Sequence, residues 1–515
     1  MKYVLSLLGI LMMANFSFGQ KMRIKVHEHK DTTVFLVRYT GTKLYYADTA
    51  EMKKGVVEFD GKKHTPGLYA LLMPGQRFFE FLVNKEEINI ETVGPNFSEN
   101  MKVIRSEENR RFKDYMSYLS VQRKTQSSLQ EARDAAKKGT PEFEQAQKKL
   151  DELNETTVAY QKKFVADNKD FLVGKMIDLT IDNEIPEPPA SVKEADKQQW
   201  RYFYYRDHFF DKFDFSNDAL VHLPIFGNRI ETYFSNKMLV QHWDTILYHA
   251  YKLIDGMDVK SKAWEFTVQY VTSTFGRSQI MGMDKVYTMM ADKYYCTRGK
   301  DGKSLAHWMT EEKLEELCDK IKVQKNLVMG VVPPNLILPD TLDATWDKLN
   351  YVNLHKLKAD YTIMYFWDPE CGHCKKITPK LAQLYNQKLK DRNVEVYAIG
   401  KANGDEYKKW KAAINKYEMQ NFKNVAVTET LLQKAKAQSW DVVPRYTTGE
   451  SLNFHITYDI YSTPQVILLD KDKKIIAKRI TISQLEDILD RMQDQTSAPK
   501  LFPVEDEDDQ QMKQN

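Results

Sequence analysis

The chain has 515 residues, of which 42% are hydrophobic and 29% are charged, a balance typical of a soluble globular protein. Its length exceeds what a single hydrophobic core supports, so we expect about three domains. The formal net charge is only +3 and no long basic run occurs, which argues against a nucleic acid as partner.

The N-terminal 19 residues are predicted to be a signal peptide. An early lysine supplies a positive charge, residues 4–13 form an apolar core, and Ser17 and Gly19 are small residues placed for a cut before Gln20. The apolar run is too short to span a bilayer comfortably, and no cysteine follows it for lipid attachment. We therefore expect export by a cleaved signal peptide to the periplasm or cell envelope, without stable membrane insertion.

Residues 20–105 are predicted to form an all-β, sandwich-like domain. Residues 22–26 alternate between polar and apolar, and residues 33–37 are a β-branched and aromatic run. Turn pairs recur at the spacing of a small β-sandwich, at residues 40–41, 60–61, 66–67 and 74–75. We find no metal cluster, nucleophile–base pair or phosphate loop here, and we expect a role in packing or partner binding.

The pattern becomes helical over residues 106–328, which are predicted to form a middle all-α domain. Its first part is a helical hairpin in which Thr140 caps the second helix and Pro141 takes the first helical position. A proline-rich joint at 185–189 leads to a second, aromatic-rich set of helices, which we interpret as core packing. No glutamate or cysteine at ligand spacing accompanies the histidines of this region, and we interpret them as ordinary residues: His208, His222, His242 and His249.

Two of the four cysteines, Cys296 and Cys318, lie 22 positions apart in this helical region. In an oxidising compartment scattered cysteines tend to form disulfides. A structural disulfide and two separately buried thiols are both compatible with the pattern.

Residues 329–495 are predicted to form an α/β domain. Expected strands cover residues 361–367, 393–399, 464–470 and 474–478, and expected helices cover residues 374–388, 405–417 and 482–492. Strands that alternate with helices predict a sheet covered on both faces. Residues 496–515 are polar and charged, and we expect a disordered tail.

The chemistry of the chain is predicted to reside in Cys371-Gly372-His373-Cys374, between a buried strand and a helix. A thiol at a helix N-terminus feels the positive end of the helix dipole, which favours the thiolate. A protonated His373 stabilises the reduced form further and makes the pair a poorer reductant than a Gly-Pro-centred one. Cys371 would attack a disulfide, and Cys374, one turn later and facing inward, would resolve the mixed disulfide.

Other interpretations of this motif are weaker. A zinc site needs two further ligands at finger-like spacing, and none is nearby. Covalent haem attachment needs a histidine directly after the second cysteine, where this chain has Lys375. We therefore expect a redox-active pair without a metal or another cofactor.

A second element, Ser462-Thr463-Pro464, directly precedes an apolar strand. Proline adopts a cis peptide bond more readily than any other residue. Alone the element is weak evidence, because a trans proline at a strand start is far commoner. Together with the cysteine motif and the order of strands, it indicates a substrate-facing loop.

Residues 331–495 resemble the thioredoxin superfamily, most closely the exported branch that includes the cytochrome c maturation thioredoxins. The matching segments are Phe366-Trp367, Cys371–Cys374, Thr463-Pro464 and Leu468–Asp470. The resemblance implies a thiol–disulfide oxidoreductase with Cys371 as nucleophile, Cys374 as resolving thiol, Pro464 as cis-proline, and substrate binding at Trp367 and Thr463. The layout as a whole resembles exported Bacteroidetes proteins in which a β domain and a helical domain of unknown function precede such a module.

Three features depart from this family pattern. Tyr365 stands where many thioredoxins have a buried aspartate that relays a proton to the second thiol. Glu370, next to Cys371, would oppose thiolate formation. Cys371 and Pro464 are 93 positions apart, and the extra segment around residues 420–455 is interpreted as loop elaboration.

The expected partners are thiols or disulfides of exported proteins and an electron-transfer partner in the membrane or periplasm. An alternative is an envelope binding or assembly protein in which the redox pair is regulatory or vestigial. Peroxide reduction fits poorly, because a peroxidatic cysteine usually stands without a second cysteine two residues away. The direction of exchange depends on the electron partner and stays open.

Overall fold

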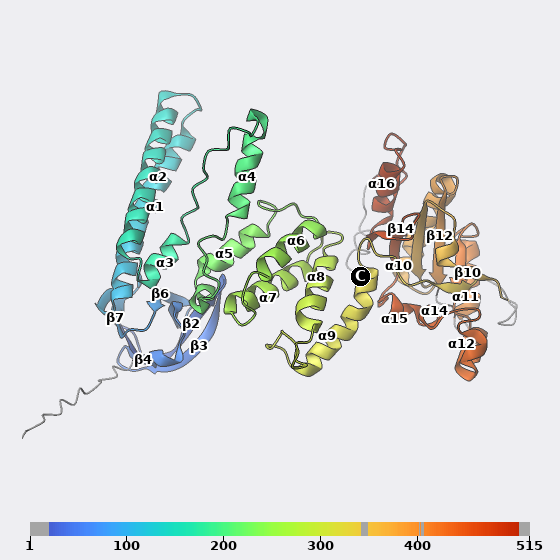
Figure 1. Cartoon of the computed structure of the whole chain (residues 1–515), viewed down its shortest axis with the longest axis horizontal. Coiled ribbons are helices and arrows are strands. Elements are labelled where there is room, and N and C mark those ends of the chain that lie inside the picture. Colours follow the sequence, from blue (N-terminus) through green and yellow to red (C-terminus); the bar gives the residue numbers. More distant parts are fainter. Residues whose placement is uncertain (1–19, 341–348, 401, 403–405, 504–515) are drawn as a thin grey trace, which may run out of the picture. The chain divides into compact units, whose positions relative to one another are not determined.

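The computed structural model describes residues 20–340, 349–400, 402 and 406–503. The chain divides into two compact units, one of Met1–Val240 with Leu253–Thr267 and one of Gln241–Lys252 with Val268–Asn515. Figure 1 shows the elements of both units. The predicted signal peptide lies outside the described residues.

The first unit begins with a β-sandwich, as the turn spacing predicts. Two four-stranded sheets have the orders β4-β1-β7-β8 and β3-β2-β5-β6. Side chains alternate along β1, where Met22, Ile24 and Val26 are buried in a core shared by the two sheets. The strands are β1 Lys21–His27, β2 Thr32–Thr40, β3 Lys43–Met52, β4 Val56–Asp60, β5 Gly67–Met73, β6 Arg77–Val83, β7 Ile88–Val93 and β8 Lys102–Arg105.

A helical hairpin of α1 Glu107–Ala135 and α2 Pro141–Asp167 follows the sandwich. The side chain of Thr140 accepts a hydrogen bond from the Phe143 N–H, and Pro141 opens α2, as predicted. Apolar residues of the hairpin and of α3 (Leu172–Asp178) share one hydrophobic cluster with Leu68 and Leu82 of the sandwich. The first helices therefore complete the β domain instead of forming a core of their own.

The predicted helical middle region is confirmed, and its remaining helices are divided between the two compact units. Helices α4 and α5 belong to the first unit and α8 and α9 to the second, whereas α6 and α7 contribute residues to each. The predicted core packing of the aromatics is confirmed only in part: Phe209 is buried, whereas α4, which carries residues 200–205, has no buried residue, and Tyr202 and Phe203 are 38% and 40% exposed. The bounds are α4 Lys197–Asp207, α5 Pro224–Tyr233, α6 Trp243–Ile254, α7 Lys262–Gly276, α8 Asp284–Ala291 and α9 Glu311–Gln324.

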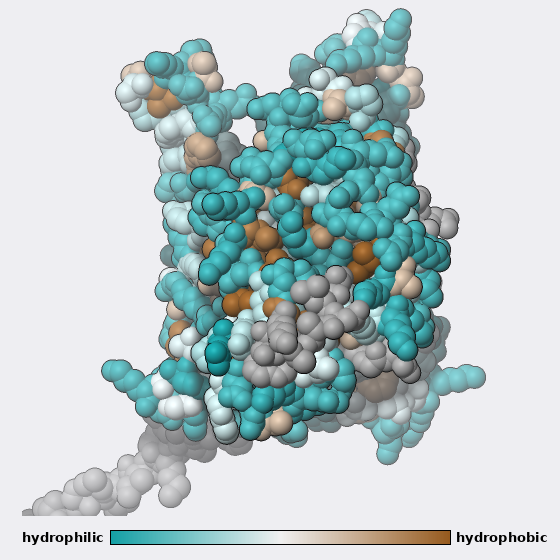
Figure 2. Space-filling model, turned by 90° about the vertical axis from the view of Figure 1, so that its right-hand side faces the viewer, coloured by the Kyte–Doolittle hydropathy of each residue, from teal (hydrophilic) through white to brown (hydrophobic). Residues whose placement is uncertain are grey.

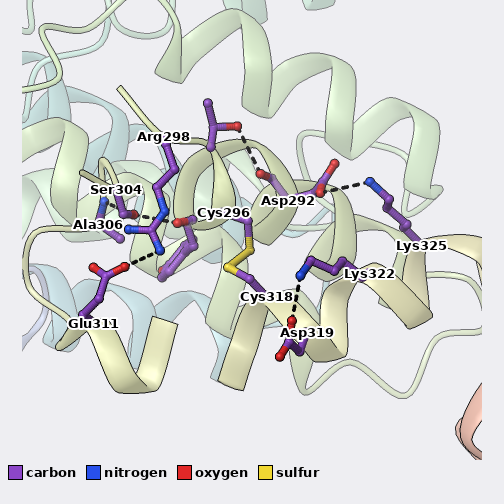
Figure 3. The surroundings of a disulfide bond; sticks show 12 residues. Asp292, Cys296, Arg298, Ser304, Ala306, Glu311, Cys318, Asp319, Lys322 and Lys325 are labelled. Carbon is purple, nitrogen blue, oxygen red and sulfur yellow. Dashed lines mark hydrogen bonds and ion pairs between the residues drawn. A yellow bond between two sulfur atoms is a disulfide. The ribbon is translucent and has the colours of Figure 1, made fainter. Parts of the chain in front are cut away.

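A disulfide joins Cys296 to Cys318, which decides between the two alternatives that the spacing leaves open. Cys296 ends a single π-helical turn, Asp292–Cys296, and Cys318 lies on α9 (Figure 3). Ion pairs of Arg298 with Glu311 and of Lys325 with Asp292 flank the bond. The disulfide and these pairs fasten α9 to the segment that follows α8.

Replacing both cysteines, Cys296→Ser with Cys318→Ser, should lower the free energy of unfolding of this unit by about 3 kcal/mol. The expected loss comes from the loop-closure entropy that a cross-link over 22 positions removes from the unfolded chain. Chemical denaturation under non-reducing conditions measures the change. Wild-type protein treated with dithiothreitol serves as the control and should match the variant; an unchanged midpoint in both would contradict a structural role.

The C-terminal domain contains a five-stranded sheet in the order β13-β12-β11-β14-β15. Successive residues of β11 point to opposite faces: Ile363 and Tyr365 join one hydrophobic cluster, and Met364 and Phe366 join the other. The predicted sheet with two covered faces is confirmed. Its strands are β11 Tyr361–Trp367, β12 Val394–Gly400, β13 Lys423–Ala426, β14 Gln465–Leu469 and β15 Ile475–Lys478.

Helices cover this sheet on both sides. Residues of α10, α11 and α16 belong to the cluster that contains Ile363, and residues near α14 and α15 to the cluster that contains Phe366. The helices are α10 Gly372–Leu384, α11 Glu406–Lys416, α12 Glu429–Ala437, α13 Ser439–Val442, α14 Gly449–Leu452, α15 Phe454–Thr457 and α16 Ile482–Met492. A small antiparallel pair, β9 Ile337–Pro339 and β10 Tyr351–Asn353, precedes them.

The expectation of a disordered tail is wrong for the first part of that segment, which makes defined contacts. The backbone N–H groups of Leu501 and Phe502 both donate to the carboxylate of Glu486, at 2.9 Å, and Lys500 pairs with Asp490 at 2.8 Å. Both carboxylates are fully buried, and a buried carboxylate requires donors, which this segment supplies. Only residues 504–515 of the expected tail lie outside the described part of the chain.

The face of the molecule on the side of the C-terminal domain is mainly hydrophilic, with hydrophobic residues in small groups (Figure 2). Within the described ranges, no helix combines the length and the apolar character that a membrane span requires.

Candidate active site

The cysteine motif lies where β11 passes into α10. After Trp367 the chain makes a tight turn in which the Cys371 N–H donates to the Asp368 carbonyl at 3.1 Å and the Glu370 N–H donates to the Asp368 carboxylate at 2.8 Å. Cys371 is the N-cap residue of α10 and has an extended backbone. The sequence therefore located the junction correctly, although the helix begins at Gly372, two residues before the predicted start.

The sulfur of Cys371 lies against the loop that precedes β14. Its Sγ donates to the Thr463 carbonyl at 3.1 Å, across 92 positions of sequence. The Thr463–Pro464 peptide bond is cis. Antiparallel pairing of β11 with β14, in which Phe366 lies opposite Gln465, brings the two segments together. The two motifs that the sequence marked separately thus form one site.

The environment of Cys371 favours its thiolate. Burial acts to raise the pKa of this half-buried thiol. Hydrogen bonds outweigh burial: the backbone N–H of Cys374, the side chains of Thr463 and Cys374, and the backbone N–H of His373 together lower the pKa below its ordinary value. The backbone N–H groups at the start of α10, which have no acceptor within the helix, therefore bind the sulfur that is predicted to be the nucleophile.

Cys374 has the opposite character. It is 1% exposed, and burial raises the pKa of its thiol to about 12. The Asp368 N–H donates to its Sγ at 3.4 Å. Both cysteines of the motif are free thiols in this structure. One thiol is thus accessible with a lowered pKa and the other is buried with a raised pKa, while their roles as nucleophile and resolving thiol stay predictions.

Tyr365, at the position of the missing aspartate, is fully buried on β11. Its hydroxyl is 2.7 Å from the Thr378 hydroxyl of α10. Burial, and then the charge of Cys374, raise the pKa of Tyr365 well above its ordinary value. A phenol of this kind stays protonated at neutral pH, so Tyr365 cannot accept the Cys374 proton as a base.

The carboxylate of Glu370 does not stand alone beside Cys371. Lys409, on α11, forms an ion pair with it at 2.8 Å, and this contact lowers the pKa of Glu370. The lysine offsets part of the negative charge that the sequence analysis expected to oppose the thiolate. No sequence signal marked Lys409, because it lies 39 positions away and only the tertiary structure brings it here.

The two other predicted site residues, His373 and Trp367, differ from each other in how deeply they are buried. His373 is half-buried in the first turn of α10, directly after Gly372. Trp367 lies in the core with 1% of its surface exposed. Its side chain belongs to the hydrophobic cluster that contains Cys374, and its expected role in substrate binding stays a prediction.

The histidines outside the motif have structural surroundings. His222 is buried, with its Nδ1 2.9 Å from the Tyr39 carbonyl, and burial lowers its pKa to about 4. The His208 Nδ1 lies 2.6 Å from a carboxylate oxygen of Asp211. Across the described ranges, no three His, Cys, Asp or Glu side chains are grouped so that they could hold a metal ion.

Two family models match the chain. Residues 359–475 match the family described as Thioredoxin-like, and residues 21–112 match a domain of unknown function (DUF4369). No curated protein matches the chain.

Several solved bacterial structures are similar to part of the chain. A domain of a possible thiol-disulfide isomerase from Cytophaga hutchinsonii is 32% identical over 33% of this chain and 96% of that chain, with a TM-score of 0.25. A thiol:disulfide interchange protein from Bacteroides sp. is 26% identical over 33% of this chain and 92% of that chain, with a TM-score of 0.25. A thioredoxin-like protein from Bacteroides caccae is 17% identical over 59% of this chain and 97% of that chain, with a TM-score of 0.37.

A Cys-x-x-Cys pair at a helix start, held against a cis-proline loop at the edge of such a sheet, defines the class of thioredoxin-like thiol–disulfide oxidoreductases. The chain belongs to the thioredoxin-like family through its C-terminal domain.

Proposed function

We propose that the protein exchanges disulfides with exported protein substrates in the periplasm through Cys371 and Cys374. The observation that carries the proposal is the asymmetry of the pair: an accessible thiol of lowered pKa rests on the cis-proline loop, beside a buried thiol of raised pKa. The signal-peptide pattern of the first 19 residues supports the location.

In the reducing direction, the Cys371 thiolate attacks one sulfur of a substrate disulfide. The new bond joins Cys371 to that sulfur, and the other substrate sulfur leaves as a thiolate and takes up a proton. Cys374 then loses its proton and attacks the Cys371 sulfur. The second substrate thiol is released and the Cys371–Cys374 disulfide forms. The pair has then given two electrons to the substrate disulfide. A dithiol partner restores the pair, and the reverse sequence inserts a disulfide.

The Thr463 carbonyl would accept a hydrogen bond in two states of this cycle, each time from a different donor. In the free protein it accepts the hydrogen bond of the Cys371 thiol. Once the thiol has lost its proton, the carbonyl has an open acceptor position beside the reacting sulfur. A backbone N–H of an extended substrate chain fits that position, which gives Thr463 a substrate-binding role that does not depend on its side chain.

Trapping tests the proposal. In the Cys374→Ala variant the mixed disulfide on Cys371 has no resolving thiol and should persist, because the attacking group of the second step is absent. Non-reducing electrophoresis of cell extracts should show adducts that dithiothreitol removes, and mass spectrometry identifies the attached proteins.

The matched control for trapping is the double variant with both Cys371→Ala and Cys374→Ala, which should form no adducts. Absence of adducts from the single variant, together with full cellular function of the double variant, would contradict the proposal. That combination would favour a binding or assembly role instead.

A further inference from the structure

A trough adjoins the redox site within the second unit. Two hollows of about 1280 and 420 Å³ share four lining residues, Gly276, Asp284, Lys478 and Arg479, and so form one continuous depression. The ends of α7, α8 and α9 form one wall, and β15 and α16 form the other. We call this depression the β15 trough.

One end of the trough lies at the cis-proline loop. Gln465, which lines it, directly follows Pro464. The backbone N–H of Arg479 donates to the Val466 carbonyl at 3.1 Å. Since Phe366 pairs with Gln465 and Ile467 pairs with Lys478, this end of the trough and the β11–α10 junction lie at the same edge of the sheet.

The walls of the trough have an excess of positive charge. Five lining residues are basic and three are acidic. All three carboxylates are engaged: Asp284 with Lys478, Asp487 with Lys500 at 3.2 Å, and Asp459 with Gln324 at 3.1 Å.

Three basic lining residues, Lys320, Arg277 and Arg479, take no part in these ion pairs. Arg277 and Arg479 are exposed, and neither guanidinium has a hydrogen-bond or ion-pair partner among the described residues. A guanidinium presents a planar fork of donors that matches a carboxylate, and a concave wall strengthens the field of such groups. The trough therefore offers two open positions for carboxylates.

We propose that the β15 trough binds acidic residues of the substrate chain next to the disulfide that Cys371 attacks, so that the protein prefers substrates with an acidic flank. The inference rests on the proposed function. The larger hollow exceeds the roughly 300–1,000 Å³ of a typical small-ligand pocket, which favours a polypeptide segment as occupant. Because the trough is continuous with the cis-proline loop, one extended chain can contact both the trough and that loop.

Reduction of matched peptides by the full-length protein tests this inference. Two disulfide-bridged peptides of equal length carry either a run of glutamates or a run of glutamines beside the disulfide, and dithiothreitol regenerates the enzyme. Wild type should reduce the acidic peptide with a higher kcat/KM. Replacing Arg277→Gln and Arg479→Gln should lower kcat/KM for the acidic peptide roughly ten-fold and leave the neutral peptide unchanged, since each exposed ion pair contributes modestly.

The control variant, Lys471→Gln with Lys474→Gln, removes the same charge from the turn at the opposite end of the β14–β15 hairpin. It should keep the acidic preference, which high salt should weaken in wild type. Equal kcat/KM of wild type for both peptides, or a preference that the arginine variant retains, would overturn the inference while leaving the redox proposal intact. Failure to reduce either peptide would instead count against the proposed function itself.

Residues 505–509 of this chain are also acidic and lie outside the described residues. A full-length variant in which their carboxylates are replaced by amides distinguishes them from a substrate. A preference that appears only in that variant would show that the trough serves the chain's own C-terminus, and would overturn a substrate segment as its occupant.

Discussion

Cys371→Ser is expected to abolish thiol–disulfide exchange by the full-length chain, lowering the rate at least about 10³-fold, to that of the uncatalysed reaction. A serine hydroxyl fills nearly the same space and can donate to the Thr463 carbonyl as the thiol does, but it cannot form the mixed disulfide. The loss would therefore report the missing covalent step and not a disturbed fold. Reduction of a fluorescent disulfide peptide with dithiothreitol as recycling reductant measures it.

The control for this prediction makes the same cysteine-to-serine change away from the motif. The variant with Cys296→Ser and Cys318→Ser loses only the structural cross-link and should keep its exchange rate at temperatures below its unfolding transition. Activity that persists in Cys371→Ser would refute the assignment of the nucleophile. Activity that falls equally in both variants would point to loss of folding instead.

Iodoacetamide at pH 7 is expected to alkylate Cys371 at least about 10³ times faster than Cys374. The thiolate is the reactive form, and a thiol with a pKa of about 12 is ionised to only about one part in 10⁵ at this pH. An ordinary thiol, with a pKa of 9.0, is ionised to about one part in 10². Burial of Cys374 slows its reaction further. Peptide mass spectrometry after timed quenching gives both rates.

The pH dependence of this alkylation tests the sign of the shift at Cys371. Because its pKa is lowered, the rate should rise with pH through a midpoint below pH 9, which is the midpoint of an ordinary thiol. Below the lowered pKa the thiol is protonated and the rate falls. The Cys371→Ala variant is the control, and its Cys374 should stay slow across this range. Equal rates for the two thiols in wild type would contradict the proposed division of roles.

The source of the low Cys371 pKa differs from the sequence interpretation. That interpretation attributed part of the effect to a positive charge on His373, whereas the contacts that lower the pKa come chiefly from the backbone N–H of Cys374 and the Thr463 side chain. A thiolate that is stabilised by fixed N–H groups is stabilised at every pH at which α10 is folded. The expectation of a less reducing pair therefore does not require a protonated histidine.

Local signals in the sequence determined much of the architecture. Strand and helix periods located β11, β12, the β14–β15 hairpin and α16 within a residue or so, because each pattern depends on near neighbours. Thr140 and Pro141 marked the start of α2 for the same reason. The motif Cys371–Cys374, placed between a strand and a helix, indicated the chemistry before any tertiary contact was considered.

Tertiary structure alone decided which distant groups meet. The bond between Cys296 and Cys318, the contact of Cys371 with Thr463, and the ion pair of Glu370 with Lys409 join segments between 22 and 92 positions apart. No local pattern encodes such distances, because the same helices and strands are compatible with many packings. The sequence therefore determined that this protein carries a thiol pair at a helix start. The fold decided which of the two thiols is accessible and ionises readily, because burial and backbone donors act only once the chain has packed.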